Sequence, residues 1–156
     1  MFQAQATQAG PREAHSFLTF FIGQETYGVQ IEAVREIIGV QPITPLPDVP
    51  SHIVGVINLR GRVIPVMCVR TRIGLEKVPT TSRTCIVVVK SGDDTVGLMV
   101  DTVSEVLEIP DCKVDTPPRV GLGSKHFLKG LGHDQDNVRL IIDLPVLLGQ
   151  PTAQAA

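Results

Sequence analysis

An internal repeat is the feature that most constrains how this chain can fold. Residues Thr26–Ile38 match Thr95–Leu107 in their apolar pattern, in a glycine and in the carboxylate that follows the first apolar run. Residues Ile53–Gly74 lie over Leu128–Gly149 at a constant offset. Neither half is long enough to bury a sufficient core alone, so the two halves should pack together.

The composition indicates that the repeat is built mainly from β-strands. Twelve prolines and fourteen glycines interrupt the 156 residues often, which favours many short strands over long helices. We therefore predict a mainly β fold of two small β-barrels related by a pseudo-twofold, with an apolar groove between them. Val34 and Val103 occupy equivalent places in the repeat and are candidates to line that groove.

A hairpin with a polar tip stands out in the first half. Two β-branched runs, Ile53–Ile57 and Val63–Val66, flank a turn that raises Asn58 and Arg60. Such a tip suits recognition, because a rigid scaffold presents a side chain at little ordering cost. Further strands are predicted at Phe17–Ile22, Thr26–Ile31, Thr84–Lys90, Thr95–Val100, Phe127–Leu131 and Val138–Asp143.

Helices should be few and short. The spacing of Ile31, Val34, Ile37 and Ile38 predicts an amphipathic helix that ends at Gly39. Val69–Gly74 and Leu144–Leu148 are also predicted to be short helices, residues 103–107 a short helix or a bent strand, and residues 41–50 an extended segment. The domain is predicted to span residues 16–149, with mobile tails at 1–15 and 150–156.

No motif indicates catalysis or a metal site. The sequence has no P-loop, no H-E-x-x-H and no G-x-S-x-G motif, and its three cysteines form no C-x-x-C pair. Asp134 and Asp136 near His133 are explained better by an Asx-rich hairpin turn than by metal binding. We therefore predict no enzyme, no cofactor and no metal, and reduced cysteines.

Charge and hydropathy exclude several classes of partner. The net charge is −2, and the most basic segment has no aromatic residue on which bases could stack, so no nucleic-acid partner is predicted. The first residues lack the features of a secretory signal, and no apolar run reaches the length of a membrane span. A soluble protein is expected, linked to a membrane only through a partner.

The charges are nevertheless unevenly distributed. Val49–Leu75 carries four arginines and no acidic residue, whereas Asp93–Asp115 carries seven acidic residues and one lysine. Two interpretations stay open: solvated hairpin surfaces, or electrostatic complementarity with partner proteins, which sets orientation and association rate more than affinity.

Four short motifs follow one another between about Phe17 and Leu148. They are Tyr27-Gly28-Val29-x-Ile31-x-x-Val34-x-Glu36-Ile37, Gly55-Val56-Ile57-Asn58-Leu59-Arg60-Gly61 with Pro65-Val66, Val96-Gly97-Leu98-x-Val100-Asp101-x-Val103, and Leu128-x-Gly130-Leu131-Gly132. Each motif is weak alone, but in this order and spacing they make the chain resemble a CheW-type chemotaxis coupling protein of the stand-alone kind.

The resemblance implies both a fold and a function. The fold is two interlocked five-stranded β-barrels of SH3- or OB-like type, built roughly from residues 17–74 and 84–149 with some exchange of strands. The function is that of a non-catalytic cytoplasmic adaptor. Such adaptors bridge the cytoplasmic tips of methyl-accepting chemoreceptors to the regulatory domain of a histidine kinase in membrane-associated arrays. Any self-association is expected to be weak.

The resemblance also implies site residues. The receptor tip is expected at Val34, Glu36, Arg60, Cys85, Gly97 and Val103. An apolar groove suits an amphipathic helix, which inserts anchors at helical spacing. For the kinase, Ile37, Ile38 and Val40 are the expected contacts at one barrel end.

Two departures and two alternatives accompany this resemblance. Cys68 stands where many members have aspartate, although the repeat-equivalent Asp143 keeps it, and Cys85 stands where an aliphatic residue is usual. One alternative is coupling in a non-flagellar pathway such as surface motility. The other is a small-molecule-binding barrel or an uncharacterised enzyme, which would need a closed polar pocket between the barrels.

Overall fold

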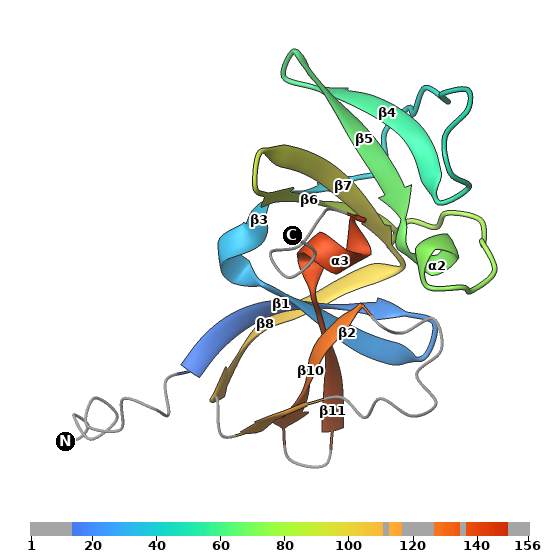
Figure 1. The fold of residues 1–156 in the computed structure, drawn as a ribbon. Helices are drawn as coiled ribbons and strands as arrows, with labels where there is room; N and C mark the ends of the chain where they lie inside the picture. The colour runs from blue at the N-terminus through green and yellow to red at the C-terminus, as the bar shows by residue number, and fades with distance from the viewer. Residues whose placement is uncertain (1–13, 111–112, 117–126, 135–136, 150–156) are drawn as a thin grey trace.

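A computed structural model describes residues 14–110, 113–116, 127–134 and 137–149 of the chain. These residues form β-strands joined by short turns, with three short helical segments (Figure 1). The strands are β1 (Ala14–Ile22), β2 (Glu25–Gln30), β3 (Val34–Gly39), β4 (Ile53–Leu59), β5 (Arg62–Cys68), β6 (Cys85–Ser91), β7 (Asp94–Val100), β8 (Thr102–Pro110), β9 (Val114–Asp115), β10 (Leu128–Asp134) and β11 (Asn137–Ile142). The helical segments are η2 (Ile31–Ala33), α2 (Val69–Arg72) and α3 (Leu144–Leu147).

The strands form two sheets that exchange strands between the halves of the chain. Sheet A, the lower sheet in Figure 1, has the order β8-β1-β2-β11-β10-β9, and sheet B, the upper sheet, has the order β3-β6-β7-β5-β4. The early strands β1 and β2 thus lie in the sheet of the late strands, while β6 and β7 lie in the sheet of the early ones. The mainly β, interlocked fold is confirmed.

The pairing register shows that the sequence repeat is a structural repeat. In sheet B, β5 pairs parallel with β7 so that Val66 lies opposite Gly97. In sheet A, β11 pairs parallel with β2 so that Ile141 lies opposite Gly28, the equivalent pair under the repeat. Because each half donates a hairpin to the other sheet, neither sheet can form from one half alone.

One predicted helix is wrong beyond its first turn. Residues 31–33 form a 3-10 turn, but Val34–Gly39 is strand β3, paired antiparallel with β6. The spacing by three and four arises because the register shifts between Val34 and Glu36, which lets an apolar run change face within a strand. Residues 103–107 belong to strand β8, which has the matching register shift against β1. The bent-strand alternative was the correct one there.

The other local predictions hold with small differences. The hairpin of β4 and β5 and the helices α2 and α3 form as expected. β1 begins at Ala14, whereas the strand was predicted from Phe17 and the domain from residue 16. The expected tails otherwise lie outside the described residues. In the proline-rich segment, Thr44 exchanges two backbone hydrogen bonds with Val56, with N···O distances of 2.9 and 2.8 Å. Gly55 permits this approach, because a Cβ there would lie 2.2 Å from the Thr44 carbonyl oxygen.

The largest apolar cluster, here called the central core, belongs to both sheets. It contains the fully buried Phe20 and Tyr27 of sheet A and the buried Val87 and Leu98 of sheet B. Phe20 and Tyr27 stack with ring centroids 6.3 Å apart. Burial and the hydrogen bond to Glu25 raise the pKa of Tyr27, so its hydroxyl stays protonated. The sheets therefore fold around one shared interior.

Each sheet also has a smaller core of its own. The sheet B core is lined by buried apolar residues on the other face of that sheet, namely Ile57, Ile64, Val66, Cys68, Ile86, Val88 and Met99. In sheet A the corresponding cluster is Phe17, Ile109 and Ile141. No helix among the described residues is long and apolar enough to cross a membrane.

Candidate protein-binding site

The register shift in β3 divides the predicted site residues between two faces of sheet B. Val34 lies opposite Val89, whose side chain belongs to the central core. Two residues further on, Glu36 lies opposite Val88, which belongs to the sheet B core. Because directly paired residues point to the same face of a sheet, Val34 and Glu36 face opposite sides of β3.

Three of the predicted receptor-binding residues lie on the central-core side. Val34, Cys85 and Val103 are each partly buried and pack against the central core. Val34 lies on β3, at one edge of sheet B, and Val103 lies on β8, at one edge of sheet A. The structure thus brings the two repeat-related valines to the margin of the same apolar interior, one from each sheet.

The same side carries two further apolar residues that are more exposed. Ile37 lies opposite Val87 on β6 and is 44% exposed. Val106 lies opposite Leu18 on β1 and is 54% exposed. Ile37 and Val106 are equivalent under the repeat. No motif in the sequence pointed to Val106, although the repeat makes it the counterpart of Ile37.

On the other side of β3, Glu36 meets the tip of the β4–β5 hairpin. Both oxygens of its carboxylate accept hydrogen bonds from the Arg60 guanidinium: Nη2 donates to Oε1 at 2.9 Å, and Nη1 donates to Oε2. This pairing lowers the pKa of Glu36, which stays ionised. The Arg60 side chain is 72% exposed and that of Glu36 is 25% exposed, so the guanidinium is offered to solvent while it is held in place.

The turn explains how Arg60 is oriented. Arg60 and Gly61 have φ angles of 53° and 84°, so both central residues of the two-residue loop are left-handed, as in a type I′ turn. The Asn58 side-chain oxygen accepts a hydrogen bond from the Gly61 N–H at 2.9 Å. The predicted rigid hairpin with a polar tip is therefore present, and Asn58 faces the turn itself.

Gly97 lies in the same register row as Glu36, because Val88 is paired with both residues. It is buried on β7, where a Cβ would lie 2.7 Å from Cγ2 of Ile86 inside the sheet B core. Close packing therefore accounts for the glycine. Of the predicted kinase-binding residues, Ile38 packs against the sheet B core, whereas Val40 is 41% exposed just after β3 ends.

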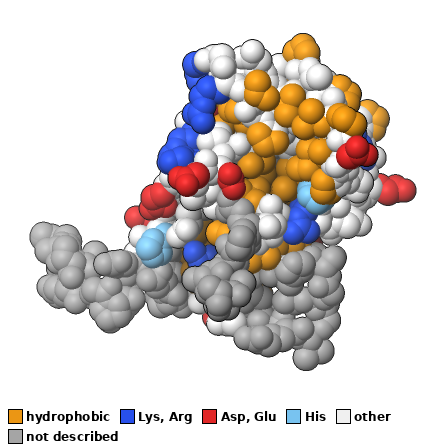
Figure 2. All heavy atoms as spheres, turned by 45° about the horizontal axis from the view of Figure 1, so that its top comes forward, with side chains coloured by type: hydrophobic (Ala, Val, Ile, Leu, Met, Phe, Trp, Pro, Cys, Tyr) orange, Lys and Arg blue, Asp and Glu red, His pale blue; other side chains and the backbone are white. Residues whose placement is uncertain are grey.

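The space-filling view shows where apolar side chains reach the surface. Figure 2 shows them gathered on the face around the β4–β5 hairpin, with a row of basic side chains along one margin. Exposed large hydrophobic residues of the first half include Ile37, Val40, Leu46 and Val63. Apolar patches of this kind on a folded domain often mark surfaces that bind other proteins.

Most arginines of the basic segment are engaged within the chain. Besides the Arg60–Glu36 pair, Arg70 forms a two-pronged ion pair with Asp101. Arg72 donates hydrogen bonds to the carbonyl oxygens of Leu147 and Val146 at the end of α3, at 2.7 and 3.0 Å. The Arg70–Asp101 pair thus joins the basic segment to the acidic one within the chain, a contact that neither of the two interpretations anticipated.

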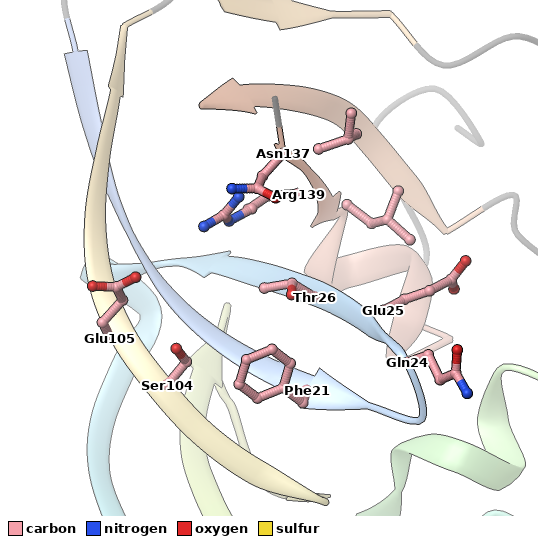
Figure 3. A pocket seen from close by; sticks show the side chains of 10 residues that line it. Phe21, Gln24, Glu25, Thr26, Ser104, Glu105, Asn137 and Arg139 are labelled. Carbon is pink, nitrogen blue, oxygen red and sulfur yellow. The ribbon is translucent and has the colours of Figure 1, made fainter. Parts of the chain in front are cut away.

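Two hollows at the surface are also related by the repeat. One, of about 610 Å³, lies where β8, β1, β2 and β11 approach one another (Figure 3). In Figure 3, Asn137 and Arg139 extend from β11, while Glu105 lies on β8. The equivalent hollow in sheet B, of about 430 Å³, includes Arg62 and Asp94. Most of the residues that line the first hollow are exposed, so it is not the closed pocket that a small-molecule-binding barrel would need.

Among the described residues, no group of three potential metal ligands was found. His133 pairs with Asp115 through its Nε2 atom, which links β10 to β9. The side chain of Asp134 and residues 135–136, which the expected Asx-rich turn includes, lie outside the described part of the chain.

The shared core and the repeat-related edge strands define a two-sheet domain with internal pseudo-twofold symmetry. The CheW-like domain family matches residues 16–151. A probable chemotaxis protein CheW from Rhizobium etli is 31% identical over 99% of both chains. The crystal structure of the scaffolding protein TtCheW from Thermoanaerobacter tengcongensis superposes with a TM-score of 0.82 at 30% identity, covering 92% of this chain and 97% of that one. Protein FrzA from Myxococcus xanthus is 32% identical over 89% of this chain and 86% of its own length.

The chain belongs to the CheW-like domain family. The predicted resemblance is thereby confirmed, and it covers nearly the whole chain rather than a single motif.

Proposed function

We propose that this protein is a non-catalytic adaptor that couples the cytoplasmic tips of chemoreceptors to a histidine kinase in chemotaxis signalling. Family membership supports the class, since relatives are named chemotaxis proteins and a similar solved structure is described as a scaffolding protein. We place the adaptor in the cytoplasm, at arrays of membrane receptors, which it reaches through its partners.

One structural observation carries the proposal for the receptor. Four apolar residues related in pairs by the repeat follow the edge strands β3 and β8 on the side of the central core: Val34 with Val103, and Ile37 with Val106. The inner pair is partly buried and the outer pair is exposed. An amphipathic helix can place its apolar face on such a strip, because its anchors recur every three to four residues.

The Arg60–Glu36 pair, on the other side of β3, supplies a second proposed contact. Arg60 is exposed and its guanidinium is fixed by Glu36, so little side-chain entropy would be lost when a partner binds it. The receptor tip is proposed to contact the Arg60–Glu36 pair at the hairpin side and the apolar strip at the core side. Cys85, on β6, is also assigned to the apolar strip, whereas Gly97 is assigned only a packing role in sheet B.

For the kinase contact, two of the three predicted residues are kept. Ile38 and Val40 stay the predicted contacts with the regulatory domain of the kinase, near the end of β3. Ile37 was predicted with them, but its side chain shares the face of Val34, so we assign it to the receptor strip.

A binding experiment tests the proposal directly. The purified protein is titrated with a soluble coiled-coil fragment that contains a chemoreceptor tip, and separately with the regulatory domain of the histidine kinase, both from the same genome. Saturable binding to each is expected, and a ternary complex should form. Binding to neither would overturn the adaptor function.

A second candidate is coupling in a chemosensory pathway with a non-flagellar output, such as surface motility. It is retained because one similar protein is named FrzA rather than CheW. Deletion of the gene distinguishes the two: loss of swimming chemotaxis supports the first candidate, and loss of directed surface movement alone supports the second.

A further inference from the structure

Asp101 stands where the chain passes from one sheet to the other. It follows β7 of sheet B and directly precedes β8 of sheet A. Its carboxylate accepts three hydrogen bonds: from Nε of Arg70 at 2.8 Å, from Nη2 of Arg70 at 2.6 Å, and from the backbone N–H of Gly23 at 2.9 Å. The Arg70 and Asp101 side chains are 18% and 26% exposed, so the pair is half-buried.

The three groups come from separate parts of the fold. Arg70 belongs to α2, which follows β5 of sheet B, and Gly23 lies in the turn between β1 and β2 of sheet A. Arg70 also donates a hydrogen bond from Nη1 to the Glu76 carbonyl oxygen at 3.3 Å. The first residues of β8 are thereby held against both sheets at once.

The repeat shows that strands of this kind form without such a junction. The residue equivalent to Asp101 is Glu32, in the 3-10 turn before β3, and the residue equivalent to Arg70 is Pro145, at the start of α3. Proline cannot donate a side-chain hydrogen bond, yet β3 and α3 are formed. A folding requirement common to both halves therefore does not account for the Arg70–Asp101 pair.

The Arg70–Asp101 pair instead holds β8, the strand that carries one side of the proposed receptor strip. Among the described strands, β8 lies at the edge of sheet A and is paired with β1, and edge strands have few constraints at their ends. Val103 lies two residues after Asp101, and Val106 lies further along the same strand. The opposite side, β3, is held instead by the Glu36–Arg60 pair.

We propose that Arg70 and Asp101 are positioning residues that fix β8, and with it Val103 and Val106, in the place where a receptor helix binds. Two arginines of the basic segment thus have different tasks: the exposed Arg60 holds β3 and faces the partner, while the half-buried Arg70 holds β8 and does not. This inference rests on the proposed function, because it concerns the same strip.

The matched variants are Arg70→Lys and Arg72→Lys. Both arginines lie on α2, are partly buried and donate two or more hydrogen bonds, but the partners of Arg72 are the α3 carbonyl groups rather than Asp101. Lysine keeps the charge and loses the planar fork in each case. The affinity for the receptor-tip fragment is measured by calorimetry at a temperature where circular dichroism shows each variant fully folded.

Arg70→Lys is expected to weaken receptor-tip binding about three- to tenfold, with binding to the kinase regulatory domain unchanged. Amide hydrogen exchange should accelerate in residues 102–107 of β8 and stay as in the wild type in residues 34–39 of β3. Arg72→Lys should leave tip affinity and β8 exchange unchanged. Asp101→Asn should reproduce the β8 exchange of Arg70→Lys, and it replaces that variant if Arg70→Lys does not fold.

The outcomes separate this inference from the proposed function. If the wild type does not bind the tip at all, the adaptor function is wrong, and the exchange of β8 still decides whether the junction positions that strand. If the wild type binds and Arg70→Lys binds equally well, or if both lysine variants lose affinity to the same extent, the positioning role is overturned.

Discussion

Arg60 and Glu36 join the tip of the β4–β5 hairpin to the edge strand β3, with Nη2 of Arg60 2.9 Å from Oε1 of Glu36. The pair lies beside Leu59 and Ile38, both of which pack against the sheet B core. It therefore connects β4 and β3, which are the two ends of sheet B in the order of the described strands and are not paired with each other there. The exposed guanidinium is held in place without being buried.

Substitution of Arg60 by asparagine should separate function from folding. A residue with left-handed backbone is strained unless it is glycine, asparagine or aspartate, and Asn-Gly is the preferred type I′ pair. Arg60→Asn should therefore keep the urea midpoint at or above that of the wild type, whereas receptor-tip affinity should fall about tenfold. Chemical denaturation and calorimetric titration measure the two quantities.

Two companion variants sharpen this result. Arg60→Lys keeps the charge without the two-pronged geometry and should lose part of the affinity. Glu36→Gln frees the guanidinium and should also weaken binding, because Arg60 is then no longer held in one orientation. Normal tip binding by Arg60→Asn would show that Arg60 is only a turn residue.

The Asp101 carboxylate should make stability dependent on pH in the acid range. Hydrogen bonds from Arg70, and to a lesser extent from Gly23, lower the pKa of Asp101 in the folded state. Its contribution is thus complete above the unfolded pKa of about 4 and is lost as pH falls through the lower folded pKa. Asp101→Asn should reduce the unfolding free energy at pH 7 by about 1–3 kcal/mol.

The difference between wild type and Asp101→Asn is the decisive quantity. It should be constant between pH 5 and pH 8 and should shrink below about pH 4, as the wild type loses its own ion pair. Urea unfolding at several pH values measures it. A difference that persists unchanged at pH 2 would mean that the ionised carboxylate is not what stabilises the junction.

Most of the fold could be predicted from the repeat, because equivalent residues of the two halves form equivalent strand pairs in the two sheets. Val66 opposite Gly97 and Ile141 opposite Gly28 are the same contact made twice. The helix predicted over Ile31–Ile38 failed because spacing alone cannot distinguish a helical stripe from a strand whose register shifts. The same register shift puts Val34 and Glu36 on opposite faces of β3. The sequence could not predict this, because residues two apart in a regular strand share a face.

The internal ion pairs could not be predicted either. Arg70 and Asp101 are distant in the sequence, and only the exchange of strands between sheets brings them together. The basic and acidic segments were visible as composition, but composition does not say whether opposite charges meet within the chain or across an interface. The exposed tip of the β4–β5 hairpin could be predicted, since the conformation of a two-residue turn is set by its own residues.

The side chain of Asp143 should stabilise α3 more than the side chain of the repeat-equivalent Cys68 stabilises α2. Its side chain accepts a hydrogen bond from the Val146 N–H at 3.4 Å and caps the helix, whereas the equivalent Cys68 makes no side-chain cap on α2. Asp143→Ala should lower the unfolding free energy by about 0.5–2 kcal/mol, and Asp143→Asn, which can still cap, should lower it less. Equal losses in the two variants, measured by urea unfolding, would show that capping is not the cause.

A charge placed on the exposed pair of the apolar strip should block the receptor without unfolding the protein. Ile37 and Val106 are each about half exposed, so Ile37→Asp and Val106→Asp should change stability by no more than about 0.5 kcal/mol. Val63→Asp is the matched control, because Val63 is 67% exposed but lines the hollow of sheet B rather than the strip. Receptor-tip affinity should fall at least tenfold in the first two variants and stay unchanged in the third. If Ile37→Asp instead loses only kinase binding, then Ile37 is a kinase contact, as the sequence first suggested, and the receptor strip ends at Val34.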